Sequence, residues 1–133
     1  MNTKLMRRIT LVMLLIAPSF AFSQNDVLDN VASAIRTGNS KEIARYFDSN
    51  VEITILERES SYSKTQGEMV LRDFFSKNQV QAFDLKHRGT SGEGSTYGIG
   101  TLKTNAQMYR VYYFVKQKGS QQVIQEMRFE KQK

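Results

Sequence analysis

The spacing of apolar residues changes at Asn78, and each spacing is typical of one kind of secondary structure. Before Asn78, most apolar side chains recur every three to four residues, which is the period of an amphipathic helix. After Asn78 they alternate with polar side chains in segments separated by short polar turns, which is the period of strands. Helices followed by consecutive strands predict an α+β fold in which the helices cover one face of an antiparallel sheet.

Start and stop signals predict two helices and a strand ahead of the main helix. Asp26 is a good N-cap for a first helix, and Gly38 is a C-terminal stop for it. Ser40 is expected to cap a second, short helix. Residues 48–50 (Asp-Ser-Asn) form a cluster of turn residues. Residues 51–55 then alternate between apolar and polar side chains, which predicts a strand.

A third helix is predicted after a polar connection. Residues 57–61 are polar and predict a turn, with Tyr62 at the edge of a short pairing segment. Ser63 and Gln66 have the spacing of a capping box, in which each side chain satisfies a backbone amide of the other residue. The helix that they open carries apolar residues at helical spacing and is expected to run to about Lys77.

Four strands are predicted in the last part of the chain. The first carries Phe83, Leu85 and His87, which share one face because side chains two residues apart in a strand point the same way. Consecutive strands joined by short turns are expected to pair as an antiparallel meander. The other three strands are expected over residues 97–104, 108–118 and 122–130.

The strand at residues 108–118 is apolar on both faces. Met108, Tyr112 and Phe114 lie on one face together with Arg110, and a second apolar set fills the other face. Helices cover only one face of a sheet, and a solvated face is normally polar. The second face is therefore expected to meet either a second copy of the protein or, in a strongly bent strand, another part of the same chain.

Four glycines lie close together in and before the strand at residues 97–104, namely Gly92, Gly94, Gly98 and Gly100. They do not match a phosphate-binding glycine motif, because that motif lies between a strand and a helix and here a strand follows. The pattern instead predicts a hairpin turn, followed by a glycine face that marks a bend or a close approach in the sheet.

The first 23 residues have the three parts of a secretory signal peptide. Lys4, Arg7 and Arg8 form a positive region, residues 9–17 are apolar, and Ala21-Phe22-Ser23 provides small residues at a cleavage site. The alternative is a retained N-terminal anchor. The expected product is residues 24–133, one domain that is exported to the periplasm or secreted, with no membrane span after removal of the signal.

Composition excludes several classes of site. The chain has no cysteine, so it has no disulfide, no thiol nucleophile and no acylated cysteine of a lipoprotein. His87 is the single histidine, which excludes metal sites built on several histidines. The formal net charge is +6, but basic residues do not cluster with aromatic ones, so nucleic-acid binding is not expected. No cofactor is expected either.

Four segments stand out: residues 74–78 (FFSKN), 83–89 (FDLKHRG), 97–104 (YGIGTLKT) and 109–111 (YRV). They resemble an exported bacterial family of uncharacterised proteins, the domain of unknown function 4783. The family is similar to the nuclear-transport-factor-2-like superfamily, also called the cystatin-like cone. The resemblance implies a bent antiparallel sheet wrapped around helices, with a pocket at its wide end. It also implies pairing of many members through the outer sheet face, but no particular chemistry.

A few polar and aromatic residues of the predicted strands are candidates for a site. His87 is the candidate general acid or base, with a structural, hydrogen-bonded histidine as the alternative. Arg110 is a candidate clamp for a carboxylate or phosphate, with an ion pair to Glu126 or Glu52 as the alternative. The complete set of candidate ligand-binding residues is Tyr97, Arg110, Tyr112 and Arg128.

Two hypotheses for function follow from these residues, and a third is a structural assembly module that acts only as a dimer. The first is a non-enzymatic protein of the cell envelope that binds a small amphipathic ligand or a protein partner, and also forms a homodimer through the outer sheet face. The second is an isomerase- or dehydratase-like enzyme in which His87 is the base and Tyr97 or Arg110 polarises a carbonyl group. The second hypothesis requires His87 to lie in a cavity within hydrogen-bond reach of one of these residues.

Overall fold

The computed structural model describes residues 26–133, and the predicted signal peptide lies outside them. Helices α2 (Val27–Arg36) and α3 (Ser40–Ala44) come first, and Gly38 between them has a left-handed φ of 61°, as a helix stop requires. The side chain of Asp26 accepts a hydrogen bond from the amide of Leu28 at 2.9 Å, which confirms the first N-cap.

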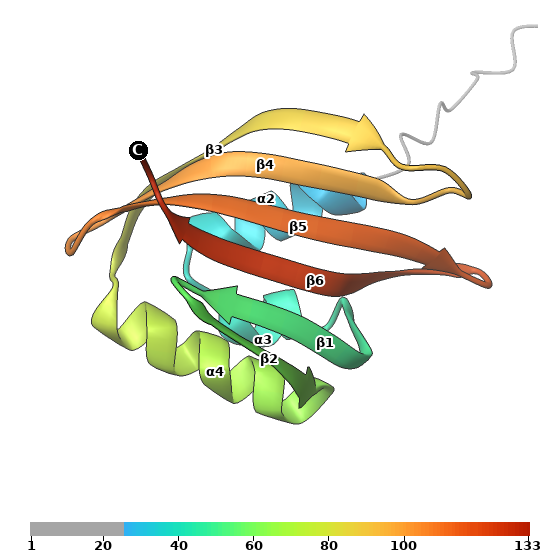
Figure 1. Cartoon of the computed structure of the whole chain (residues 1–133), viewed down its shortest axis with the longest axis horizontal. Helices are drawn as coiled ribbons and strands as arrows, with labels where there is room; N and C mark the ends of the chain where they lie inside the picture. The colour runs from blue at the N-terminus through green and yellow to red at the C-terminus, as the bar shows by residue number, and fades with distance from the viewer. Residues whose placement is uncertain (1–25) are drawn as a thin grey trace, which may run out of the picture.

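Six strands form one sheet in the order β2-β1-β6-β5-β4-β3 (Figure 1). The strands β3 to β6 form the antiparallel meander that the sequence predicts. The hairpin of β1 and β2 adds to the free edge of β6, and the β1–β6 pair is parallel. The strands are β1 (Phe47–Ile55), β2 (Arg58–Ser63), β3 (Val80–Thr90), β4 (Thr96–Thr104), β5 (Met108–Lys118) and β6 (Gln121–Lys131).

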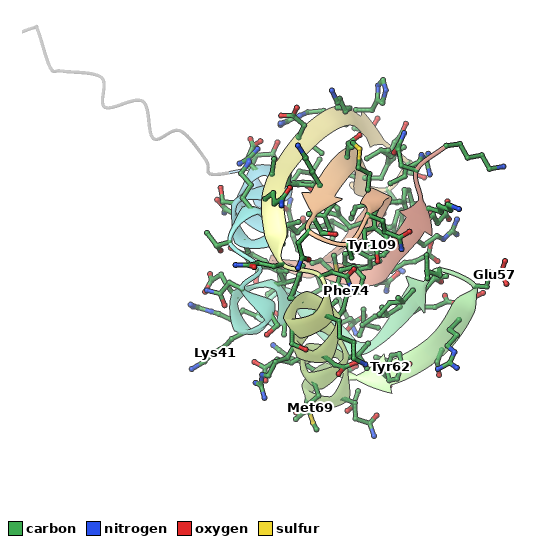
Figure 2. All side chains as sticks on the ribbon, turned by 90° about the vertical axis from the view of Figure 1, so that its left-hand side faces the viewer. Lys41, Glu57, Tyr62, Met69, Phe74 and Tyr109 are labelled. Atoms are coloured by element: carbon green, nitrogen blue, oxygen red, sulfur yellow. The ribbon has the colours of Figure 1, made fainter. Side chains whose placement is uncertain are left out.

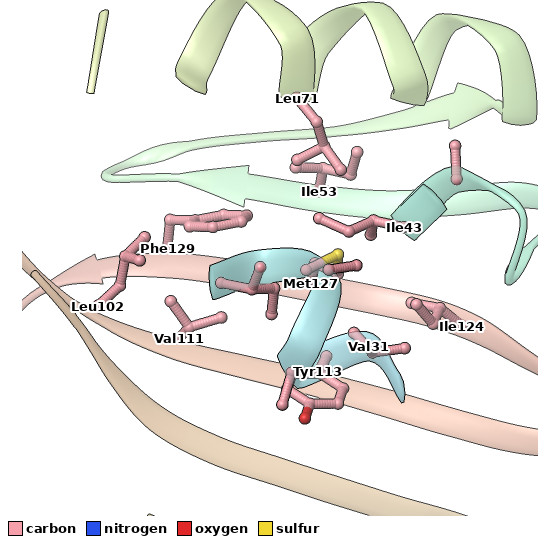
Figure 3. Close-up of a cluster of buried hydrophobic side chains, with 14 of the residues drawn as sticks. Val31, Ile43, Ile53, Leu71, Leu102, Val111, Tyr113, Ile124, Met127 and Phe129 are labelled. Atoms are coloured by element: carbon pink, nitrogen blue, oxygen red, sulfur yellow. The ribbon is translucent and has the colours of Figure 1, made fainter. Parts of the chain in front are cut away.

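The helices cover one face of this bent sheet, which confirms the predicted α+β class. In Figure 1, α2 and α3 lie behind the sheet, and α4 (Lys64–Lys77) runs beside the β1–β2 hairpin. The core between the two layers takes side chains from every helix and from β1, β3, β4, β5 and β6, and Figure 3 shows part of it. Its most buried large residues include Ile35, Ile43, Ile53, Leu71, Tyr113 and Phe129.

The main helix, α4, begins with the predicted capping box. The amide of Gln66 donates to the Ser63 hydroxyl, the amide of Ser63 donates to the Gln66 side chain, and both distances are 3.2 Å. One turn later, Gly67 lets the helix approach β1 closely, because a Cβ atom there would lie 2.9 Å from side-chain atoms of Phe47 and Val51. The first half of α4 is therefore held tightly against the sheet.

Three predictions at element ends are wrong. The side chain of Asn39, not Ser40, accepts from the amide of Glu42 and caps α3. Residues 48–50 lie inside β1, where the register with β6 shifts, so these turn residues form a bulge in place of a chain reversal. Residues 58–61 belong to β2; the hairpin turn is confined to Leu56 and Glu57, and Leu56 has a left-handed φ of 56°.

At the glycine face of β4, side chains of neighbouring strands approach the backbone closely, which was one of the predicted alternatives. A Cβ atom at Gly98 would lie 2.8 Å from the ring of Tyr113, and one at Gly100 would lie 2.6 Å from the ring of Phe83. These inward-facing positions must be small, because aromatic side chains of neighbouring strands lie across them. Between Asp26 and Lys133, no helix is long and apolar enough to cross a membrane.

Candidate functional site

A cavity of about 510 Å³ lies between α4 and the β1–β2 hairpin, and we call it the α4 cavity. Figure 2 views the molecule from the side and labels Tyr62, Met69, Phe74 and Tyr109, which line this cavity. Its walls are mainly apolar, as is usual for sites that bind small molecules. The apolar wall residues are Ile53, Ile55, Leu56, Tyr62, Met69, Val70 and Phe74.

The cavity exists because the second half of α4 and the end of the hairpin do not meet. Met69, Val70, Asp73 and Lys77 recur at helical spacing and line the cavity from α4. From the other side, the tight turn at Leu56 ends the hairpin and brings side chains of β1 and β2 to the cavity. No helix residue fills the space between these two walls.

Two large apolar side chains at the cavity are exposed. Leu56 is 44% exposed and Met69 is 58% exposed, although both line the cavity. The apolar surface also continues outward, since Tyr62, Met69 and Val70 line an adjoining shallow depression as well. Exposed apolar surface that is concave and contiguous favours a binding site over ordinary solvated surface.

The polar groups in the floor of the cavity already bond to one another. The hydroxyl of Tyr109 donates to Oδ1 of Asn78 at 2.6 Å and accepts from Nε2 of Gln107 at 2.9 Å. The amide nitrogen of the Asn78 side chain donates to the carbonyl oxygen of Phe74 at 3.0 Å. This network closes the C-terminal end of α4 against β5 and leaves the floor without a free acid or base.

Charged groups occur only at the rim of the cavity. Nζ of Lys77 lies 3.0 Å from a carboxylate oxygen of Asp73, and both side chains are largely exposed. Arg58, at the start of β2, also lines the cavity and is exposed. No nucleophile–base pair is present among the residues that line the α4 cavity.

Three of the four candidate ligand-binding residues lie close together on the opposite side of the sheet, and the fourth, Arg110, lies on the same side. We call this side the outer face, and it is the face that the helices leave uncovered. The rings of Tyr97 and Tyr112 are 6.2 Å apart, and the guanidinium of Arg128 lies 5.1 Å from the centre of the Tyr112 ring. Ile99 and Phe114 complete this half-buried patch through the register of β4 and β5. None of the four candidates lines the α4 cavity.

The ion pairs of the outer face differ from the prediction. Arg110 pairs with Glu130 at 3.6 Å, because these two residues are direct neighbours across β5 and β6. Glu126, which was expected to pair with Arg110, instead lies 2.7 Å from the guanidinium of Arg128. The sequence could not give these partners, because the register depends on a bulge between Phe114 and Val115 in the β5–β6 pairing.

The carboxylates of the outer face influence one another. A hydrogen bond with the Glu59 carboxyl group raises the pKa of Glu52, and the negative charges of Glu59 and Glu126 add to this effect. Burial raises the pKa of Tyr112, and the charge of Glu126 adds to it. Glu52, Tyr112 and Phe114 line a hollow of about 460 Å³ on this face.

His87 does not lie where the sequence predicts. The register shifts between Leu85 and His87, so that Leu85 pairs with Gly100 on the inner face and His87 pairs with Ile99 on the outer face. Arg88 takes the inward position that alternation gave to His87. His87 is exposed and does not line the α4 cavity. The bulge has no marker in the sequence, because residues 83–89 alternate normally.

Sequence reasoning missed the residues that line the α4 cavity. Met69 and Val70 were among the apolar residues expected at helical spacing, and Tyr62 was expected at the edge of a short pairing segment, since local periodicity cannot show that two elements stand apart. Leu56 carried the one available signal, because it is a large apolar residue directly before the predicted polar turn at residues 57–61. Among residues 26–133 there is no group of three or more His, Cys, Asp or Glu side chains placed to hold a metal ion.

The bent sheet with helices on one face defines the class of this protein. An NTF2-like protein of unknown function from Cytophaga hutchinsonii has the same fold, with a TM-score of 0.57 at 10% identity over 78% of this chain and 85% of that one. At this identity the likeness shows the fold alone. The chain therefore has an NTF2-like α+β fold.

This chain belongs to the family of the domain of unknown function DUF4783, whose model matches residues 28–130. A DUF4783 protein from Bacteroides uniformis is 30% identical, with a TM-score of 0.77 over 81% of this chain and 99% of that one. Another, from Bacteroides ovatus, is 31% identical, with a TM-score of 0.75 over 78% of this chain and 94% of that one. No curated protein matches the sequence. The predicted family and fold are thereby confirmed.

Proposed function

We propose that this protein is a non-enzymatic binding domain that takes up an amphipathic small ligand in the α4 cavity. The observation that carries the proposal is a cavity of about 510 Å³ with apolar walls and two exposed large apolar residues, Leu56 and Met69. Small-molecule sites commonly have volumes of roughly 300–1,000 Å³. A ligand that covers these side chains removes their apolar surface from water, which favours binding.

The proposal is tested by titrating the protein with decanol while its amide signals are followed by NMR. Decanol is uncharged, so it reports on the apolar walls alone. We expect the largest shifts at Tyr62, Met69 and Val70, and weaker binding by Val70→Phe, whose larger side chain occupies part of the cavity. Ile99→Ala, on the outer face, is the matched control and should bind normally. Absence of binding, or shifts confined to the outer face, would overturn the proposal.

The outer face supports a second proposal, which is a homodimer. Tyr97, Ile99, Tyr112 and Phe114 form a half-buried apolar patch with charged residues around it, and interfaces are commonly built in this way. An isologous dimer would bury this patch against its own copy. A protein partner from the cell envelope is the alternative occupant.

Sedimentation analysis separates these two occupants. Tyr112→Glu places a charge in the centre of the patch and should weaken dimerisation by at least about tenfold, as is usual for a central aromatic residue. Thr90→Glu adds the same charge at the end of β3 and should leave dimerisation unchanged. A wild-type protein that remains monomeric at millimolar concentration would exclude the homodimer.

The enzyme hypothesis is not carried further, because His87 is exposed on the outer face and the α4 cavity offers no acid–base pair. The proposed setting is the periplasm or the cell exterior, and it depends on the signal-peptide pattern of residues 1–23. N-terminal sequencing of the protein from an exporting cell should begin at Gln24. An N-terminus at Met1 would contradict the export proposal.

A further inference from the structure

We infer that the ligand of the α4 cavity is a free single-chain amphiphile with one negative charge, whose carboxylate is bound by Arg58 and whose apolar chain lies against α4. The inference depends on the proposed binding function and adds to it the charge and the orientation of the ligand. It is derived from three features of the cavity: an unpaired cation, a neutralised pair and a floor with no free polar group.

Arg58 is the unpaired cation. It is the first residue of β2 and pairs with Ile55 across the hairpin, so its side chain starts at the mouth of the cavity. Within residues 26–133, no carboxylate forms an ion pair with it, although most other arginines of this region have such a partner. A guanidinium group binds a carboxylate through two parallel hydrogen bonds, which gives direction as well as affinity.

Asp73 and Lys77 do not change the sign of the charge at the mouth. Their side chains form an i,i+4 ion pair at 3.0 Å on α4, and the two charges offset each other. Arg58, Lys77 and Asp73 are the charged residues that line the cavity, so one positive charge remains. A ligand with a single negative charge is therefore attracted, and a cationic ligand with the same chain is repelled.

The floor determines the orientation of the ligand. Every buried polar side-chain atom in the described part of the chain has a hydrogen-bond partner, and at the floor the partners are Asn78, Tyr109 and Gln107. A charged headgroup placed there would lose its water without finding a free donor, which is costly. The headgroup consequently stays at the mouth beside Arg58.

The apolar chain then has a continuous path along α4. Tyr62, Met69 and Val70 line both the α4 cavity and the adjoining depression, so the apolar surface extends beyond the cavity toward Gln66. A flexible, unbranched chain can follow this path. Met69 suits such a contact, because methionine side chains adapt to irregular apolar surfaces.

Three probes with the same ten-carbon chain test the inference by isothermal titration calorimetry: decanoate, decanol and decyltrimethylammonium. We expect decanoate to bind wild-type protein about tenfold more tightly than decanol, as one charge-assisted contact allows. Decyltrimethylammonium should bind most weakly. Arg58→Gln should reduce decanoate affinity to that of decanol and leave decanol affinity unchanged. Arg128 is an exposed cation on the outer face, so Arg128→Gln is the matched control and should change neither the decanoate affinity nor the decanol affinity.

The outcomes separate this inference from the function on which it depends. Equal affinity of the three probes would leave the cavity as a binding site and overturn the charge and the orientation. Normal decanoate binding by Arg58→Gln would overturn the role of Arg58. If no probe binds, the proposed function itself fails and the inference fails with it. Because Arg58 is exposed, its replacement should leave the fold intact, and unchanged decanol binding would demonstrate this.

Discussion

The two ends of the sheet are covered in different ways. At one end, α2 lies against β3, β4 and β5, and the space between the layers is filled; we call this the closed half. At the other end, α4 lies beside the hairpin of β1 and β2, and the α4 cavity remains between them; this is the open half. Both halves consist of a helix over strands, so the difference lies in the side chains.

The closed half is held by long-range hydrogen bonds in addition to packing. The hydroxyl of Tyr113 donates to the carbonyl oxygen of Leu28 in α2 at 2.7 Å. Nε of Arg36 donates to the carbonyl oxygen of Phe83 in β3 at 3.0 Å. Burial raises the pKa of Tyr113, so its hydroxyl stays protonated as this hydrogen bond requires.

In the open half, α4 packs on the core with one face: Leu71 and Phe74 are buried there, while Met69 and Val70 line the cavity. Gly67 packs against β1 at the first turn, and Asn78 bonds to Tyr109 after the last turn. Between these points, the helix presents Met69 and Val70 to a space that the hairpin does not fill. Helix α4 is therefore buried along one face and borders the cavity along the adjacent face.

Gly100→Ala should produce the largest effect, because it places a methyl group inside the closed half. The added Cβ would meet the carbonyl oxygen of Asp84 and the ring of Phe83, and the carbonyl belongs to a paired strand that moves only at a cost. We expect a loss of about 3 kcal/mol in the free energy of unfolding, at the upper end of overpacking effects. Urea denaturation measures it.

Gly119→Ala is the control for this substitution. Its Cβ would have no neighbour within 4 Å, but the left-handed φ of 63° makes any side chain strained there, at a cost of about 1 kcal/mol. If Gly100→Ala costs no more than this control, the closed half has free space, and the contrast between the two halves does not hold.

The sequence predicts the elements of both halves but not the difference between them. The capping box at Ser63 and the patterns that predict β4 and β5 as strands are local signals, and the structure confirms them. The bulge before His87 and the register of Arg110 depend on which strand lies alongside, so no local pattern reports them. The α4 cavity depends on the distance between two elements that are each regular, which is why its lining residues were missed.

Val70→Phe should make the open half resemble the closed one. Val70 is half-buried and lines the cavity, so a larger apolar side chain can enter space that is now empty. We expect a gain of about 0.5 kcal/mol in the free energy of unfolding, as cavity-filling substitutions commonly give. Urea denaturation with Ile99→Val as a control for the outer face measures the change. A loss of more than about 1 kcal/mol would show that this region is already packed to native density.

Arg88→Gln should have the smallest effect, and it tests the charged edge of the closed half. Arg88 bridges Asp26 and Asp29 of the α2 N-terminus at 2.9 and 2.6 Å, and its hydrogen bond holds the pKa of Asp29 below its usual value. A carboxyl group with a lowered folded-state pKa stabilises the protein above its unfolded-state pKa of about 3.9, and this contribution is lost as the pH falls through the folded-state value. The variant should therefore be less stable than wild type at pH 7 and approach wild type near pH 3.

Since these side chains are about half exposed, the difference should be small and should shrink in 0.5 M salt, which urea midpoints at both pH values would detect. A difference independent of pH would mean that Arg88 acts through packing of its aliphatic stem, not through Asp29.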